Sequence, residues 1–382
     1  MNDAISRWWD EFRRQAPRVA RLFSREDEWD LAGWMNEHLG AIHPELMWEF
    51  GPAVRCEGHR LVITPETRRA LRPLVREVLK AAPAMSGWEF YEYRLPENLE
   101  LATQTVGGRV GGDFAGRRIL VHARPAEFNR INLTFEFSPP DPDEQHAFAV
   151  AYVYSESLLG EEVLDRWIGT IDAGPIPDDG LAAIGLDELR AQVTELVREI
   201  LVKLPDRPWH QVDIENGVPW AGMKTDPEEA DDYPLQRDLF VVSTPAPEML
   251  HNALSGLPFD SARFSRCGER FCFLKIDGGQ GLPVDSPFAD RSDIEDAINA
   301  VLRPAKSGCA IGGGTGLRYS YIELALTDVD AAWLQIQPIL QAGGLSRRTW
   351  LMFHDDDLSR TWRGLFEDTP APPEQAELPD AN

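Results

Sequence analysis

The chain has 382 residues and a formal net charge of −25, because its 63 acidic side chains outnumber its 38 basic ones. Such an excess of carboxylates argues against non-specific binding of nucleic acid, which needs lysine and arginine on one face. With 43% hydrophobic and 26% charged residues, the composition is that of a globular protein, and no apolar run is long enough to span a membrane.

The first residues and the cysteines indicate the compartment. Trp8 and Trp9 lie among charged side chains, which does not resemble a secretory segment. Cys267 and Cys272 are separated by four residues and no second pair lies at metal-binding spacing, so zinc and redox motifs are not indicated. We therefore expect a cytoplasmic protein that needs no metal and no cofactor, and that contacts neither membrane nor nucleic acid.

The N-terminal part, residues 1–204, is expected to form one α+β domain. Apolar residues at helical spacing predict helices over 3–22, broken or kinked at Pro17, and over 26–39, 64–81, 97–108 and 186–203. Residues 158–168 fit a helix or an irregular segment. Alternating patterns predict strands over 46–50, 59–63, 88–93, 118–123, 130–137 and 147–154. The first two strands fit a hairpin, and the last three give the strongest antiparallel signal.

Residues 205–234 change in character, because prolines recur and the run Asp226–Asp232 is densely acidic. We interpret this stretch as a connection between two domains. Residues 367–382 are also rich in proline and acid, and we expect them to form a disordered tail.

The C-terminal part, residues 235–366, has the more regular pattern. Strands are predicted over 238–243, 262–267, 270–276, 317–326 and 349–353, and helices over 246–254, 292–302 and 329–340. The local order β-α-β-β-α-β favours a ferredoxin-like domain, with helices on one face of an antiparallel sheet. The sequence therefore predicts an α+β protein of two domains with mainly antiparallel sheets and packed helices.

A glycine cluster at 312–316 precedes the strand predicted at 317–326. Gly313 and Gly314 permit a loop that wraps an anion with backbone N–H groups, and Arg318 would be its charged member. Phosphate loops, however, have a strand before the glycines and a helix after them. A structural bend or bulge before the strand is therefore favoured over a ligand-binding loop.

The densest group of ionisable residues is His354-Asp355-Asp356-Asp357. His354, Asp355 and Asp357 could bind a hard cation or form an acid–base pair. Neighbouring side chains in an extended segment point in opposite directions, which disfavours one shared ion. The alternative is a solvated turn in which an aspartate caps a short helix over 358–365, and this interpretation is favoured.

Two aromatic strands carry glutamates that are candidate ligand-binding residues. Glu49 lies between Trp48 and Phe50, and Glu89 lies between Trp88 and Phe90. In a cleft lined by rings, such carboxylates would have raised pKa values. The alternative is that they lie on the solvent face of amphipathic strands, and we favour this alternative.

The sequence contains none of the common catalytic motifs, such as Gly-x-Ser-x-Gly, His-Glu-x-x-His or a Walker loop. Together with the negative charge, this favours a non-catalytic protein that binds a basic protein partner, in an immunity or regulatory role. The alternative is an enzyme or small-ligand binder with a cleft near residues 312–318.

Overall fold

The computed structural model describes residues 2–139, 143–214, 216–279 and 281–373. These residues form ten α-helices and three sheets whose strands pair mostly antiparallel, so the α+β class is confirmed. The contacts group residues 2–125 and 131–195 into one compact unit. A second unit consists of residues 126–130 and the described residues from 196 onward.

The first half of unit 1 surrounds a three-stranded sheet with the order β1-β2-β3. Its elements are α1 (Asn2–Phe23), α2 (Leu31–His38), β1 (Met47–Pro52), β2 (His59–Thr64), α3 (Arg72–Lys80) and β3 (Trp88–Tyr91). β1 and β2 pair antiparallel, as expected for the hairpin, and β3 pairs parallel to β2. Trp8, Trp9 and Phe12 of α1 form a buried aromatic core with Leu61 and Ile63 of β2.

α1 agrees within one residue with the helix predicted over 3–22, and it continues through Pro17, where the sequence predicts a break or a kink. One helix boundary in this half does differ from the sequence-based prediction. The helix predicted from residue 64 begins only at Arg72, after a 3-10 turn over Arg69–Leu71. The reason is local, because Glu66 has φ +52, which is incompatible with an α-helix.

The second half of unit 1 has a four-stranded sheet with the order β6-β5-β4-β7. Its strands are β4 (Arg118–Ala126), β5 (Arg130–Ser138), β6 (Ile168–Ala173) and β7 (Ile184–Gly185). Its helices are α4 (Leu99–Val110), α5 (Glu144–Leu159), α6 (Glu161–Trp167) and α7 (Leu189–Lys203), and the division between the units falls within α7.

The strand predicted over 147–154 is wrong, because these residues lie in α5. Asp143 caps this helix by accepting hydrogen bonds from the backbone N–H groups of Gln145 and His146, and Gly160 with φ +81 ends it. Almost the whole second half of α5 is buried. A helix that is apolar on all sides has no polar face, so its hydrophobic pattern does not distinguish it from a strand.

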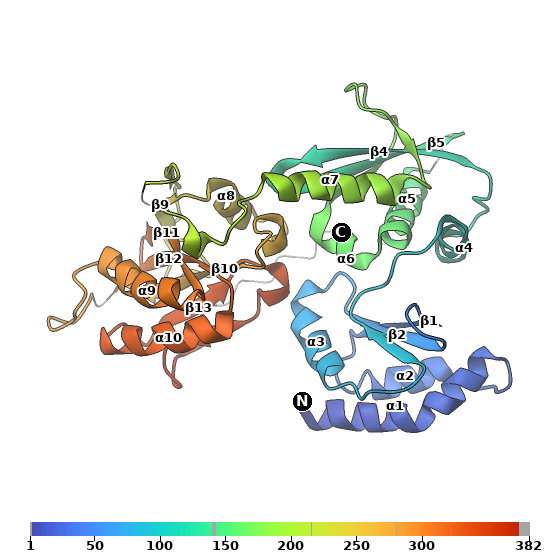
Figure 1. Cartoon of the computed structure of the whole chain (residues 1–382), viewed down its shortest axis with the longest axis horizontal. Coiled ribbons are helices and arrows are strands. Elements are labelled where there is room, and N and C mark those ends of the chain that lie inside the picture. Colours follow the sequence, from blue (N-terminus) through green and yellow to red (C-terminus); the bar gives the residue numbers. More distant parts are fainter. Residues whose placement is uncertain (1, 140–142, 215, 280, 374–382) are drawn as a thin grey trace. The chain divides into compact units, whose positions relative to one another are not determined.

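Unit 2 contains a seven-stranded sheet with the order β14-β13-β10-β12-β11-β9-β8 (Figure 1). Its strands are β8 (Ala221–Lys224), β9 (Leu239–Thr244), β10 (Arg270–Asp277), β11 (Gly308–Gly316), β12 (Tyr319–Leu326), β13 (Thr349–Phe353) and β14 (Trp362–Gly364). Every described pairing in this sheet is antiparallel.

Helices cover this sheet on both faces. α9 (Arg291–Ala305) and α10 (Val329–Ala342), both orange in Figure 1, pack against one face and against each other. Ile298 and Ile336 belong to the core that they form with Leu324 of β12. α8 (Pro247–Ser255) contributes Leu250 to the core on the other face.

Several predictions in unit 2 are corrected. Residues 262–267 do not form a strand, because Asp260 starts a 3-10 turn over Ser261–Arg263, and β10 pairs with β12 and β13 instead. The helix predicted over 358–365 is replaced by a 3-10 turn over Asp356–Leu358 and by β14. The interpreted connection, 205–234, contains a 3-10 turn at Trp209–Gln211 and β8, which belongs to the sheet.

The expected disordered tail, residues 367–382, is described only as far as residue 373. Within the described part, Thr369 is buried and the carbonyl oxygen of Pro370 accepts a hydrogen bond from Trp350 Nε1 at 2.7 Å. Residues 374–382 lie outside the described residues.

Candidate functional site

The glycine cluster forms β11, not a loop. Gly313 and Gly314 are buried between β12 and β9, and the register shifts at a bulge between Ala310 and Gly312. A Cβ on Gly313 would lie 2.7 Å from the carbonyl oxygen of Tyr321, and one on Gly314 would crowd the side chain of Leu239. The open loop that a ligand cleft at this position requires is therefore not formed, and glycine is needed here for close packing.

The acidic turn spreads its side chains over different partners. His354 Nε2 lies 2.7 Å from Glu323 Oε2, whereas Asp355 accepts hydrogen bonds from the backbone N–H of Ser261 at 2.7 Å and from its hydroxyl at 2.6 Å. Arg270 Nη1 lies 3.0 Å from Asp355 and 3.8 Å from Asp357.

Asp355 is 1% exposed, so the turn is less solvated than the sequence suggests. Burial raises the pKa of Asp355 to about 6, although the neighbouring Arg270 acts in the opposite direction. No group of three or more metal-ligating side chains with the geometry of an ion site occurs among the described residues.

The two candidate glutamates of unit 1 have different binding partners. Glu49 forms ion pairs at 3.3 Å with Arg60 and with Arg94. Glu89 accepts hydrogen bonds from the Tyr91 hydroxyl and from the backbone N–H groups of Val54 and Arg55.

For Glu89, neither interpretation holds: the side chain is 7% exposed, so it does not lie on the solvent face of its strand, and its pKa is not raised. The hydrogen bond from Tyr91, helped by that from the Val54 N–H, lowers the pKa of Glu89 to about 2, and burial only partly opposes this effect. A carboxylate in this environment stays ionised, so it is not suited to act as a proton donor at neutral pH.

A polar cluster that the sequence does not indicate lies under residues 231–238. Lys275 is buried in β10, donates to the carbonyl oxygen of Tyr233, and lies 4.0 Å from the centroid of the Tyr319 ring. The Tyr321 hydroxyl donates to Asp238. Burial lowers the pKa of Lys275 to about 8, although Asp238 acts in the opposite direction.

Arg318, one of the candidate residues, belongs to the outer part of this cluster. Arg318 Nη2 and Arg348 Nε both bind Asp277 Oδ2, at 2.9 and 2.8 Å. Arg348 Nη2 also binds Asp232 at 2.6 Å, and the Gln236 amide binds the buried Glu323 at 2.6 Å. These charges pair with one another, and their effect is to hold residues 231–238 against the sheet.

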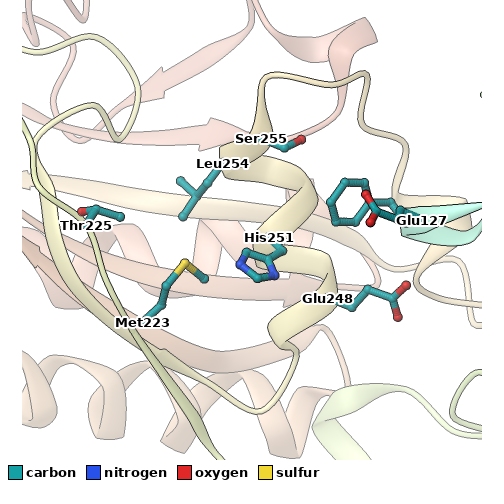
Figure 2. Close-up of a pocket in the computed structure, with 8 residues that line it drawn as sticks. Glu127, Met223, Thr225, Glu248, His251, Leu254 and Ser255 are labelled. Carbon is teal, nitrogen blue, oxygen red and sulfur yellow. The ribbon is translucent and has the colours of Figure 1, made fainter.

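The remaining candidate is a cavity of about 550 Å³ beside β8. It is lined by Glu127, Phe128, Met223, Thr225, Glu248, His251, Leu254 and Ser255, which Figure 2 shows on α8, on the chain at β8 and on the turn at residue 127. We call this cavity and the adjoining edge of β8 the β8–α8 groove. Its volume lies within the range of about 300–1,000 Å³ that is usual for ligand sites.

The sequence of α8 explains why one of its sides is open. Pro247 begins the helix and Gly256, with φ +76, follows it. Met249 and Leu250 are buried against the sheet, whereas Glu248 and His251 are exposed toward the groove. The side of the helix that lines the groove therefore carries Leu254 together with the polar residues Glu248, His251 and Ser255.

β8 is an edge strand. It pairs with β9, and no described strand pairs with its other edge. The N–H of Thr225 donates to Phe240, and because bonding alternates along an antiparallel pair, the backbone groups of Gly222 and Lys224 point away from β9. The outer edge of β8 therefore offers N–H and C=O groups for pairing.

The wall opposite β8 is a tight turn at residues 127–129. Phe128 and Asn129 have φ values of +59° and +58°, an unusual conformation for two successive residues other than glycine. Asn129 Nδ2 donates to the carbonyl oxygen of Arg263 at 2.8 Å, and Phe128 packs against the core of unit 2. Local strain of this kind is common at binding sites.

The sequence matches no protein-family model, no curated protein and no solved structure. In the part of the chain that the structure describes, none of the helices has the length and apolar character needed to cross a bilayer. The function therefore has to be inferred from the β8–α8 groove and its surroundings. None of the candidate residues chosen from the sequence lines this groove.

Proposed function

We propose that this protein is a non-catalytic binding module for a basic protein partner, in an immunity or regulatory role, and that the partner docks on the β8–α8 groove. The observation that carries the proposal is an unpaired strand edge beside an apolar cavity whose rim is acidic. Exposed strand edges and apolar grooves are two recurring surfaces for peptide recognition.

The charge of the groove favours a basic partner. Glu127 and Glu248 are exposed at the rim. The segment that leaves β8 adds four exposed carboxylates, those of Asp226, Glu228, Glu229 and Asp231. In β8 and this segment, Lys224 is the one basic side chain. Complementary charge of this kind raises the association rate and rejects partners of like charge.

We further propose that the chain has two domains and that the C-terminal one is ferredoxin-like. The support is that β10, α9, β11, β12, α10 and β13 follow one another in the chain, while their strands have the spatial order β13-β10-β12-β11. In this view β9 and β8 extend the ferredoxin-like sheet and create its binding edge. Limited proteolysis should cut between residues 204 and 234 before it cuts within 239–353, and the opposite order would contradict the two-domain proposal.

The first experiment identifies the partner by affinity capture from the native host with the full-length protein, followed by mass spectrometry. Association rates with the captured partner are then measured between 0.1 and 1 M salt, a range over which the Debye length falls from about 10 to about 3 Å. We expect the rate to fall steeply with salt and the dissociation rate to change much less.

The matched variants are Glu127→Gln with Glu248→Gln, compared with Asp285→Asn with Asp296→Asn. Both pairs remove two exposed negative charges, but only the first pair lies at the groove. We expect the first pair to slow association more than the second. Equal effects, or an association rate that does not depend on salt, would contradict the proposal.

A further inference from the structure

We infer that the partner contributes an extended segment that pairs with β8 as an additional strand, with aliphatic and then basic side chains at alternate positions facing the groove. This inference rests on the proposed function and names the partner's binding element. It is drawn from the direction of the backbone groups in β8 and from the chemistry of the cavity.

The backbone geometry supports strand addition. Gly222 and Lys224 are two residues apart and both direct their N–H and C=O groups to the open edge, which is the spacing at which an added strand forms hydrogen bonds. Both residues are exposed.

The cavity sets the preferred side chains. In an added strand, every second side chain would point to the face of the sheet on which α8 lies. There Phe128, Met223 and Leu254 provide half-buried apolar surface, which suits aliphatic groups. Beyond them Glu127 and Glu248 are exposed, and these carboxylates suit a lysine or an arginine.

Two other occupants fit the same edge less well. The chain's own residues 374–382 include Glu374, Glu377, Asp380 and Pro379, so they are acidic and interrupted by a residue that cannot donate to a ladder. A second copy pairing through β8 would bring two acidic segments at 226–231 together. Charge therefore favours a basic segment of another protein.

The test uses the full chain and a defined probe, the fluorescent N-acetylated peptide Thr-Val-Thr-Val-Thr-Lys-Thr-Lys. The key variant is Gly222→Pro, which removes an N–H at the open edge. Gly222→Ala is its control, because it keeps the N–H and its Cβ would lie 3.9 Å from the nearest atom, the carbonyl oxygen of Val242. We expect Gly222→Ala to bind as the wild type does and Gly222→Pro to bind at least about tenfold more weakly.

A second measurement does not depend on how well Gly222→Pro folds. The same peptide is prepared with N-methyl groups on its odd or on its even residues, and both forms are titrated into the wild-type protein. In strand addition only one set of N–H groups faces β8. We therefore expect one form to lose binding by at least about tenfold and the other to retain it.

The outcomes separate this inference from the proposed function. If the peptide binds, and binds more weakly to the variant Glu127→Gln with Glu248→Gln, but neither Gly222→Pro nor N-methylation changes its affinity, strand addition is wrong and the basic-partner proposal stands.

If the peptide does not bind, or binds no better than a form with both lysines replaced by glutamate, strand addition by a basic segment is overturned. The proposed function then fails only if the captured partner also associates with the variant Glu127→Gln with Glu248→Gln as fast as with the wild type. Self-association that Gly222→Pro abolishes would identify a second copy as the occupant and overturn the inference.

Discussion

Arg72 in unit 1 and Lys275 in unit 2 are both buried cations, and the two are bound very differently. Arg72 of unit 1 is 1% exposed, and its Nη2 lies 2.7 Å from Glu161 and 2.8 Å from Asp165. Its Nη1 donates to the backbone carbonyl oxygen of Glu92 and to the hydroxyl oxygen of Thr64. Lys275 of unit 2 is equally buried but binds one carbonyl oxygen and the face of one ring.

The pKa values respond in opposite directions. Although burial disfavours its charged form, the pKa of Arg72 is raised by Glu161 and Asp165, so this residue is charged at every ordinary pH. The pKa of Lys275 is lowered to about 8 because burial outweighs its acidic neighbours, Asp238 and Asp232. A guanidinium with several carboxylate and carbonyl partners is a permanent crosslink, whereas an ammonium with few partners is a titratable contact.

The largest effect is expected for Arg72→Met. It leaves the buried carboxylates Glu161 and Asp165 without their main partner, which usually costs about 3–5 kcal/mol. Chemical denaturation followed by tryptophan fluorescence measures this loss. The control is Arg68→Met, because Arg68 binds Glu45 at 2.8 Å but is 54% exposed, and we expect a change below about 1 kcal/mol. Similar losses in both variants would show that the buried ion pairs of Arg72 stabilise the protein no more than the exposed ion pair of Arg68 does.

Lys275 should make the stability of unit 2 depend on pH. Between pH 8 and 10.5 the unfolded chain holds the lysine proton and the folded chain has released it, so stability should rise with pH in this window. The full contribution is on the order of 3 kcal/mol. Denaturation curves of the wild type and of Lys275→Met are measured from pH 7 to 10. The difference between their free energies of unfolding gives the contribution of Lys275 at each pH. If the two proteins change in parallel, Lys275 is not the titrating group.

Gly314→Ala tests whether the stability of unit 2 depends on close backbone packing as well as on charge. The new Cβ would lie 2.8 Å from the carbonyl oxygen of Val241 and would crowd Leu239, so we expect a loss of about 1–3 kcal/mol. Gly222→Ala, whose Cβ would make only an ordinary contact with the carbonyl oxygen of Val242 at 3.9 Å, should change stability by less than about 0.5 kcal/mol. Thermal unfolding of the two variants checks the difference, and a neutral Gly314→Ala would show that β9 and β11 are less tightly packed than described.

Within the Lys275 cluster, a smaller effect is expected for Asp232→Asn. Asp232 is about one-third exposed and binds Arg348 at 2.6 Å at the outer part of the Lys275 cluster. Solvent-exposed ion pairs contribute at most about 1 kcal/mol, so the free energy of unfolding should change by no more than this. A loss as large as that of Arg72→Met would show that the ion pair of Asp232 stabilises the fold as strongly as the buried ion pairs of Arg72 do.

Sequence patterns predict the regular part of unit 2 well. β13 spans Thr349–Phe353 as predicted, and α9 and α10 occur where apolar residues recur at helical spacing. The patterns fail where burial removes the contrast between faces, as in α5, and where composition misleads, as in β11. Glycines are usually loop residues, but here they allow strands to pack closely on a central strand.

The β8–α8 groove was not predictable from local sequence. β8 consists of Ala-Gly-Met-Lys, which contains no β-branched residue, and it is a strand because β9 pairs with it. Phe128 reaches the groove from a distant turn, and its apolar character alone does not indicate that position. Lys275 lies between Leu274 and Ile276 in β10, and its burial follows from the residues that cover it.

The outer edge of β8, with which no described strand pairs, also bears on aggregation. A free strand edge is a template on which chains aggregate, and charged residues next to such an edge reduce this risk. Asp226, Glu228, Glu229 and Asp231 directly follow β8 and are exposed. The mutual repulsion of these carboxylates opposes pairing between two copies at this edge, so it reduces the risk of aggregation through β8.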